Sequence, residues 1–517
     1  MRASAWALSL SASLVIAVGA DRGIAIIALA LSIYVALSVA TRARLALLAG
    51  VCVALVGAAG GGRLAAISAL ALAPLLLFAW RLAPERARLA TNWMDHALLA
   101  QTYPGRPMTT HHVLEVDAPF DRARLARAVA SLLDATPSLR SFTRESPLGL
   151  ARFAAPERWS RLDEILSWRD LSLDLDRSDW YLRPFDLSIE EPLRVLHAPR
   201  PGGGYQLVFT LHHSVTDGVG ALALFDALLA RYRALDGEDA VVPPALGPSG
   251  ATLRGLLARL GLGVTAALVR RNVEGARRFG AKRASLMERV DAPLDAVHAR
   301  VIDVSAVAWA RLRDRAATLG CSRNDLLLAA FLRAASAWRR ARGLGDEPFR
   351  ALVPVDLRGE FGVGRTLQNH LAVIEADFTA AEVDDASLPH RVSERLRAGR
   401  PLDRSLATPL ALGVLGAIAP PGALRAFFRW LDERPSAFMY SFLFSHIRVT
   451  GGVVAPSRAG ASRLYCLSGL PRQPGVGVTV TATPDAVTVT LAYMVPRLSD
   501  DGAERLLEAF SKALGEL

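Results

Sequence analysis

The sequence is poor in cysteine, and this limits the chemistry to expect. Its three cysteines, Cys52, Cys321 and Cys466, include no pair at the spacing of a metal site. So small and odd a number argues against a disulfide framework and fits a reducing compartment. We therefore predict neither a bound metal nor structural disulfides.

Lysine is also scarce. It occurs only at Lys282 and Lys512, so arginine carries almost all of the formal net charge of +11. A basic chain can attract nucleic acid, anionic lipid or phosphate-bearing molecules such as coenzyme A. The interleaved aromatic platforms of nucleic-acid modules are missing, so no nucleic-acid partner is predicted. Lipid and phosphorylated co-substrates are favoured.

Hydrophobic residues are abundant, at 52%, and much of the excess stands at the start of the chain. Four uncharged apolar stretches of 17 to 19 residues, each about as long as a membrane-spanning helix, occupy residues 3–20, 23–41, 45–62 and 64–80. Charged residues separate them and are expected at the two membrane interfaces. Residues 1–90 are therefore predicted to form about four transmembrane helices.

The arginines near these stretches predict their orientation. Arg2, Arg42, Arg44, Arg81, Arg86 and Arg88 flank one set of ends, and the richer side should be cytoplasmic. This predicts a multi-pass protein of the cell (inner) membrane, with its catalytic domain in the cytoplasm. Other interpretations are three spans with an interfacial segment, a signal peptide for the first stretch alone, and a buried all-helical core.

After residue 90 the pattern changes to alternating strands and helices, typical of sheets with helices packed on them. At 517 residues, two or more folded units are expected. We predict an N-terminal lobe at 91–250, a basic connecting helix at 251–294 and a C-terminal lobe at 295–517. The connecting helix carries many arginines beside a row of leucines. It is predicted either to lie on an anionic leaflet or to be an ordinary helix with a solvated arginine face.

The main chemical motif is His212-His213-Ser214-Val215-Thr216-Asp217-Gly218, directly after the apolar run 207–211. A strand that ends at two histidines can present one of them at a sheet edge, where imidazole can act as a base. Asp217 can turn back to orient the loop or pair with an arginine, and Gly218 is expected to adopt a backbone conformation closed to other residues. The doublet His111-His112 has no Asp-Gly after it, so the complete string is the stronger signal.

The string matches the HHxxxDG signature, and the chain resembles the superfamily of chloramphenicol acetyltransferase, condensation domains and bacterial wax ester synthase/diacylglycerol acyltransferases. Further resemblance lies at 139–142, 184–187 and 192–194, at Asn324-Asp325, and at Val353 to Arg358 followed by Gln368-Asn369. It covers residues 93–517. Arg194 and 445–450 depart from the wax ester synthase pattern, the DFGWG motif is not evident, and typical members lack four membrane spans.

The resemblance implies an α/β (α+β sandwich) fold of two chloramphenicol-acetyltransferase-like lobes with a substrate tunnel between them. It implies His213 as the general base, His212 and Gly218 as structural residues, and a salt bridge from Asp217, for which Arg140 is the expected partner. Asn324 and Asp325 would shape a helix near the site. Asn369, His370 and Ser445 are tunnel candidates, although His370 and Ser445 also fit the pattern of polar residues satisfied within a strand. Arg358 is expected in an internal ion pair.

These features together predict a membrane-anchored acyltransferase. It would move an acyl group from acyl-CoA or an acyl carrier protein, as co-substrate and with no other cofactor, to an alcohol or amine. The membrane segment favours a lipid-like acceptor, as in wax ester or diacylglycerol synthesis. The alternatives are amide formation in natural-product synthesis and a non-catalytic membrane platform that binds an acyl chain or carrier protein.

Overall fold

The computed structural model describes residues 94–516 except for the following gaps: 104–105, 147–148, 155–161, 176–178, 238–252, 278–282, 290–291, 293–295, 365, 420, 434–439, 450–460, 468, 470–474 and 484–485. The four predicted spans therefore lie outside the described residues. Within the described part of the chain, no helix combines the length and hydropathy needed to cross a bilayer.

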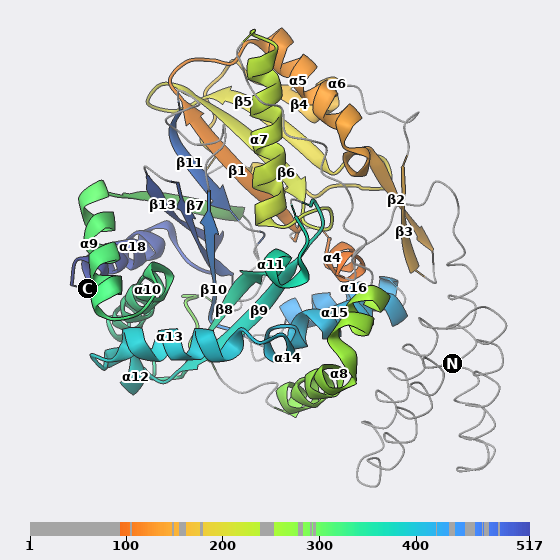
Figure 1. The fold of residues 1–517 in the computed structure, drawn as a ribbon. Coiled ribbons are helices and arrows are strands. Elements are labelled where there is room, and N and C mark those ends of the chain that lie inside the picture. The colour runs from red at the N-terminus through yellow and green to blue at the C-terminus, as the bar shows by residue number, and fades with distance from the viewer. Residues whose placement is uncertain are drawn as a thin grey trace, which may run out of the picture.

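The N-terminal lobe is built on a five-stranded sheet with the order β11-β1-β6-β5-β4. Two helices, α5 and α7, pack over one face, where Leu125, Phe209 and Phe225 are fully buried (Figure 1). The elements of this lobe are β1 (Thr109–Val116), α5 (Arg122–Ala135), η1 (Pro137–Leu139), the hairpin β2 (Ser141–Ser146) and β3 (Gly149–Ala154), α6 (Leu162–Ile165), β4 (Leu166–Trp168), η3 (Asp179–Leu182), β5 (Leu193–Pro199), β6 (Tyr205–His212), α7 (Gly218–Ala234) and β11 (Ala461–Leu467).

The C-terminal lobe holds a six-stranded sheet with the order β7-β13-β12-β10-β8-β9. Strand β10 runs parallel to β12 and β8, whereas the other pairs are antiparallel. Helices α10, α13 and α18 cover one face around Phe331, Phe442 and Phe510. The elements are β7 (Ala296–Val304), α9 (Ala306–Thr318), α10 (Arg323–Arg340), β8 (Phe349–Asp356), β9 (Leu371–Phe378), α12 (Ala380–Asp384), α13 (Leu388–Gly399), β10 (Phe442–Arg448), β12 (Val476–Ala482), β13 (Val487–Val495) and α18 (Asp500–Glu516).

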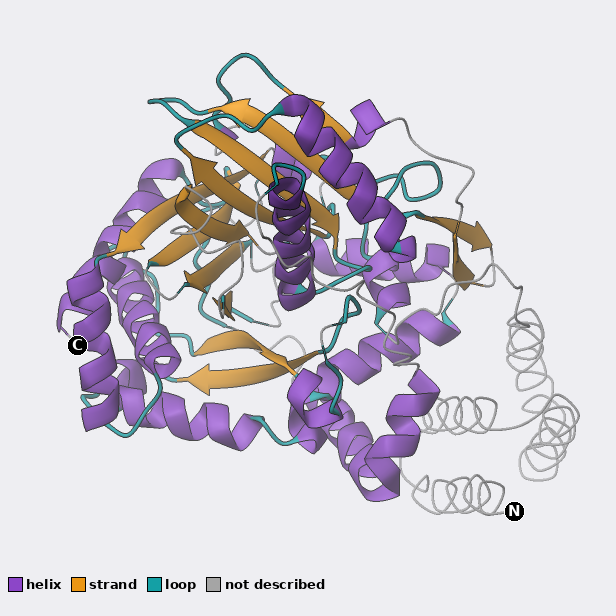
Figure 2. Cartoon of the chain, turned by 45° about the horizontal axis from the view of Figure 1, so that its top comes forward, coloured by secondary structure: helices purple, strands orange, loops and turns teal. Residues whose placement is uncertain are grey.

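A third group of helices lies beside the two sheets, across the molecule from α9, α10 and α18 (Figures 1 and 2). Its members are α4 (Asp95–Ala100), α8 (Leu253–Arg277), α11 (Arg358–Phe361), α14 (Leu402–Ser405), α15 (Ala407–Ile418) and α16 (Pro421–Asp432). They share two small apolar cores, one of which contains Leu257, Leu268 and Leu410. Helix α4 packs against both α15 and α16.

Helix α8 corresponds to the predicted basic connecting helix, and its leucines do not face outward. Leu256, Leu257, Leu260 and Leu268 are all buried in the helical core, and the helix kinks at Gly261, where φ is +74°. Arg270 is exposed, and Arg259, also exposed, places its guanidinium 5.3 Å from the centre of the Phe361 ring. A helix whose apolar face already packs on protein cannot insert that face into lipid. The buried leucines favour the second interpretation, a connecting helix with a solvated arginine face.

The two lobes are joined by shared packing and by a shared strand. Val113 and Val208 of the first sheet pack against Val297 and Met494 of the second. Strand β11, from the C-terminal part of the sequence, pairs antiparallel with β1 in the N-terminal sheet. The N-terminal lobe therefore includes one strand, β11, from beyond the predicted boundary at residue 295.

Candidate active site

His213 stands immediately after β6, at the edge of the N-terminal sheet. Its backbone N–H donates to the carbonyl of Met108 at 2.8 Å, which fastens the turn to the residue preceding β1. Met108 has a φ of +46°, a left-handed conformation that is uncommon for a side chain of this size. Within residues 212–217, His213 alone is partly exposed, and the other residues are buried. The fold therefore presents this one imidazole to the outside.

Asn369 sets the orientation of the His213 ring. The asparagine amide Nδ2 donates to the backbone carbonyl of His213 at 2.8 Å, which turns its Oδ1 toward the ring, 3.2 Å from Nδ1. An amide oxygen only accepts, so Nδ1 must carry the proton. The Nε2 atom then keeps its lone pair, on the opposite edge of the ring. Of the two ring nitrogens of neutral His213, Nε2 is therefore the one that can accept a proton.

His212 is held in the opposite tautomer by a hydrogen-bond network with Ser214, which is buried, and Thr102, which is partly buried. The N–H of Ser214 donates to its Nδ1 at 3.1 Å, so Nδ1 is the acceptor and Nε2 carries the proton. Nε2 lies 2.8 Å from the hydroxyl of Thr102, which itself donates to the carbonyl of Leu98. His212 is 0% exposed. Its structural role, implied by the resemblance, agrees with this geometry.

Asp217 ties the motif to the other lobe. It is the N-cap of α7 and accepts from the N–H of Gly220 at 3.0 Å. Both carboxylate oxygens also accept from the guanidinium of Arg358, each at 2.9 Å, and Oδ2 accepts from the N–H of His370 at 2.8 Å. The predicted salt bridge exists, but the predicted partner is wrong. Arg140 pairs instead with the exposed Asp134.

Arg358 organises the loop that carries Asn369. Besides binding Asp217, its guanidinium donates to the carbonyls of Thr366 and Gln368 at 3.1 and 3.0 Å, and to Asp356 at 2.9 Å. Burial acts to lower the pKa of Arg358, but the charges of Asp217 and Asp356 outweigh it and raise the pKa above its usual value. The arginine therefore stays charged and holds residues 366–370 against the N-terminal lobe.

Gly218 and Gly220 allow the start of α7 to pack closely on its neighbours. The reason is the lack of space for a Cβ atom, and not the special backbone conformation predicted for Gly218. The φ of Gly218 lies outside the left-handed region, and a Cβ there would meet the Cδ1 of Ile447 at 3.0 Å. Gly220 is more constrained, because a Cβ there would lie 2.2 Å from Thr216 Oγ1 and 2.9 Å from the carbonyl of Leu367. Gly220 was not among the predicted site residues, although a glycine in the first turn of α7 was a usable signal.

Asn324 and Asp325 form the start of α10, as expected. Ser322 and Asp325 make a reciprocal capping box, in which each side chain accepts from the other residue's backbone N–H. Among the described contacts, neither Asn324 nor Asp325 hydrogen-bonds to the histidine motif. Asp325 therefore stabilises the start of the helix, and the predicted role of Asn324 in shaping the helix near the site stays a prediction.

Two of the three residues predicted to line a tunnel, Asn369 and His370, instead bind residues of the histidine motif. Asn369 and His370 are buried, at 0% and 1% exposed, and bind His213 and Asp217 as described above. Burial, and then the charge of Arg358, lowers the pKa of His370. Ser445 is half-buried on β10, opposite Thr479 of β12, and its place in a tunnel stays a prediction.

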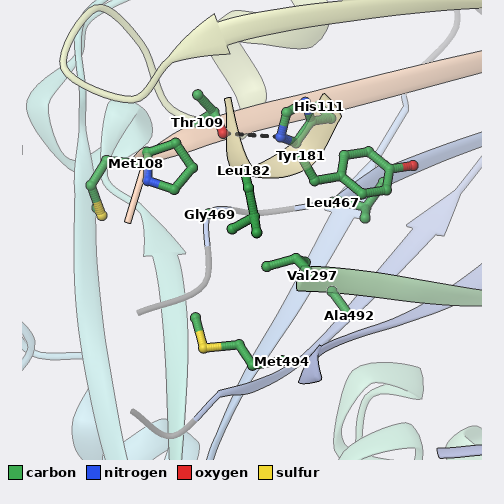
Figure 3. Close-up of a pocket in the computed structure, with 11 residues that line it drawn as sticks. Met108, Thr109, His111, Tyr181, Leu182, Val297, Leu467, Gly469, Ala492 and Met494 are labelled. Carbon is green, nitrogen blue, oxygen red and sulfur yellow. Dashed lines mark hydrogen bonds between the residues drawn. The ribbon is translucent and has the colours of Figure 1, made fainter. Parts of the chain in front are cut away.

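Two cavities of the described residues lie between the elements around the site, and no residue of the histidine motif lines either of them. The smaller one, between Met108, Thr109 and Tyr181 of one lobe and Val297 and Met494 of the other, is shown in Figure 3. Its volume of about 20 Å³ has room for roughly one water molecule.

The larger cavity, of about 740 Å³, lies between the β8–β9 hairpin and helices α4, α8, α15 and α16. Gln101 lines it, and the next residue, Thr102, binds His212. Asn369, His370 and Ser445 line neither cavity.

The other histidines of the N-terminal lobe are poor candidates for chemistry. Burial lowers the pKa of both His111 and His112 to about 3, so both are neutral structural residues at physiological pH. Cys466, 3.0 Å from His112, is buried, and burial raises its pKa to about 12. Across the described residues, no three His, Cys, Asp or Glu side chains are arranged to hold a metal ion.

Comparison with known proteins shows similarity at the level of the fold. No family model and no curated protein matches the sequence. Among solved structures, the first condensation domain of the calcium-dependent antibiotic synthetase, bound to a substrate analogue, has a TM-score of 0.58 at 19% identity, over 83% of this chain and 96% of that one. The chain has the condensation-domain fold.

Two further solved structures have a similar fold. The trichothecene 15-O-acetyltransferase from Fusarium sporotrichioides has a TM-score of 0.59 at 11% identity, over 83% of this chain and 94% of that one. The starter condensation domain of rhizomide synthetase, a double mutant bound to C8-CoA and Leu-SNAC, has a TM-score of 0.53 at 16% identity, with the same two coverages. The predicted fold of two lobes is confirmed.

Proposed function

We propose that this protein is an acyltransferase that uses His213 as its general base. The observation that carries the proposal is the Asn369 contact, which leaves the Nε2 lone pair of a partly exposed imidazole available. Solved structures with this fold include an O-acetyltransferase and a condensation domain bound to an acyl-CoA, which supports acyl transfer as the reaction class.

The chemistry follows from the position of one proton. An acceptor hydroxyl or amine gives its proton to Nε2 of His213 as its oxygen or nitrogen attacks the thioester carbonyl. The tetrahedral intermediate then collapses, the carbon–sulfur bond breaks, and the imidazolium returns the proton to the leaving thiolate. Throughout, Nδ1–H stays bonded to Asn369, and Asp217 with Arg358 holds the loop that supplies Asn369.

The donor in this proposal is acyl-CoA or an acyl carrier protein, and the acceptor is a lipid-like alcohol. The larger cavity supports a substrate with a lipid-like part, because its 740 Å³ lies within the range of ligand pockets. Apolar side chains such as Leu352, Leu412 and Phe428 line it together with charged ones such as Arg350 and Glu375. Membrane anchoring through residues 1–90, with the catalytic lobes in the cytoplasm, would raise the local concentration of such substrates and is part of the proposal.

The proposal is tested by a thiol-release assay on purified full-length protein, with an acyl-CoA donor and a fatty alcohol or diacylglycerol acceptor. The variant His213→Ala should reduce the rate by at least about a hundredfold, as expected for loss of a general base. His390→Ala removes an exposed histidine of α13 and is the matched control, with unchanged rate expected. Equal rates for His213→Ala and wild type would reject the mechanism.

Amide formation is the second candidate, and the fold supports it equally, because condensation domains share this architecture. The same assay with amine acceptors, or with aminoacyl groups on a carrier protein, separates the two outcomes by the product formed. Saturable thioester binding with no turnover on either acceptor class would instead indicate the non-catalytic platform.

A further inference from the structure

Helix α16 exposes an aromatic pair. Phe427 and Trp430, one turn apart, are 42% and 40% exposed, and their rings stack with centroids 6.2 Å apart and an interplanar angle of 20°. Leu424 and Phe428, on the opposite side of the helix, are buried against α4. The helix therefore has an inner apolar face that packs on protein and an outer aromatic face.

Helix α16 also carries arginines, of which Arg429 is exposed. Arg425 and Arg429 lie on the same helix, and Arg429 places its guanidinium 5.1 Å from the centre of the Tyr103 ring. The helix's acid, Asp432, is buried and paired with Arg106, and an exposed glutamate, Glu433, follows the helix. Exposed aromatic rings with arginines beside them are the composition of helices that lie in the interface of an anionic bilayer.

The position of α16 agrees with this composition. Helix α16 packs against α4, the first described element, which begins at Asp95, shortly after the proposed membrane region at residues 1–90. A chain anchored through that region brings α4, and with it α16, to the bilayer surface. Phe427 and Leu431 also line the larger cavity, so the same helix forms part of the rim of that cavity.

We infer that the face of α16 formed by Phe427, Arg429 and Trp430 docks into the headgroup region of an anionic bilayer. The larger cavity then opens toward the acyl chains of the membrane, and lipid-like substrates enter beside α16. This inference rests on the proposed function, since it assigns a route to the substrate of that reaction.

The test uses the full-length protein in liposomes of phosphatidylcholine, with or without phosphatidylglycerol. In a background with Cys52 and Cys321 replaced by serine, an environment-sensitive fluorophore is attached to the variant Trp430→Cys. The control is the same label on Leu171→Cys, where the native side chain is 83% exposed. We expect nitroxide lipids to quench the label at 430 roughly twofold, more strongly with the anionic lipid, and to leave the label at 171 unaffected.

A label at 430 that stays in water in both liposomes overturns the inference, even with the protein anchored. The inference is also overturned if the label at 430 is shielded from water in the absence of lipid and the shielding increases with protein concentration. A second copy of the chain would then cover this face of α16. The variant Trp430→Ser with Arg429→Gln separates docking from catalysis. Its rate should fall several-fold on acceptors embedded in liposomes and stay at the wild-type value on a short, water-soluble alcohol. No turnover by wild type on either acceptor would reject the proposed function instead.

Discussion

Removing the Arg358 guanidinium should destabilise the protein far more than removing any exposed arginine. In Arg358→Met, the Asp217 carboxylate stays buried, at 5% exposed, and loses two charge-assisted hydrogen bonds of 2.9 Å. Breaking a buried ion pair in this way costs about 3–5 kcal/mol. Because the N–H groups of Gly220 and His370 still bind Asp217, we expect the lower end, about 3 kcal/mol, or roughly a hundredfold in the folding equilibrium.

Arg140→Met is the matched control for this experiment. Arg140 binds Asp134, whose side chain is 68% exposed, and an ion pair of this kind contributes at most about 1 kcal/mol. The double variant Asp217→Asn with Arg358→Met should be less destabilised than the sum of the two single variants, because the isolated charge is then removed together with its partner.

The assay is urea unfolding of the purified full-length protein, followed by tryptophan fluorescence and read as the free energy of unfolding. Arg358→Met should also lose acyl transfer, since the loop that carries Asn369 loses its attachment. If Arg358→Met and Arg140→Met shift the unfolding free energy by the same amount, the bidentate pair does not join the lobes, and the account of the site given above is wrong.

Three further predictions follow from the same geometry. Asn369→Leu should lower kcat by about tenfold or more with little change in KM, because the His213 tautomer is no longer selected; full retention of kcat would contradict this. Gly220→Ala should destabilise the protein by about 1–3 kcal/mol in thermal unfolding, whereas Gly263→Ala, where a Cβ meets nothing within 4 Å, should not. Acidification below about pH 6.5 should weaken folding, because the folded-state pKa values of His111 and His112 are lowered to about 3 and the unfolded chain takes up protons first. The slope should reach about 1.4 kcal/mol per pH unit for each histidine, and His112→Gln should remove its share in urea titrations at pH 4 to 7.

Local patterns predicted many of the elements closely. The apolar run at 207–211, predicted to be a strand that ends at the two histidines, is part of β6. This prediction follows from a local pattern, which depends on neighbouring residues alone. The place of β11 beside β1 could not be predicted, because a strand that crosses to the other sheet has the same local pattern as one that stays.

The motif itself identified His213, His212 and Asp217, because a short string at the end of a strand carries its own geometry. The identity of the Asp217 partner did not follow from it. Arg140 and Arg358 are both arginines beside family-like segments, and only the tertiary structure brings one guanidinium to 2.9 Å from the carboxylate. Asn369 was identified as a residue of the site, but its contact with His213 spans 156 positions of sequence.

The sequence alone determined which residue types are available, namely an imidazole at a strand end, an acid after it and an arginine-rich surface. Tertiary structure decided which nitrogen of each histidine carries the proton, because that depends on the partners that Asn369 and Ser214 supply from their folded positions. It also decided which face of each amphipathic helix is buried. The leucines of α8 pack inward while the aromatic pair of α16 faces out, since packing depends on the surfaces that meet and not on composition.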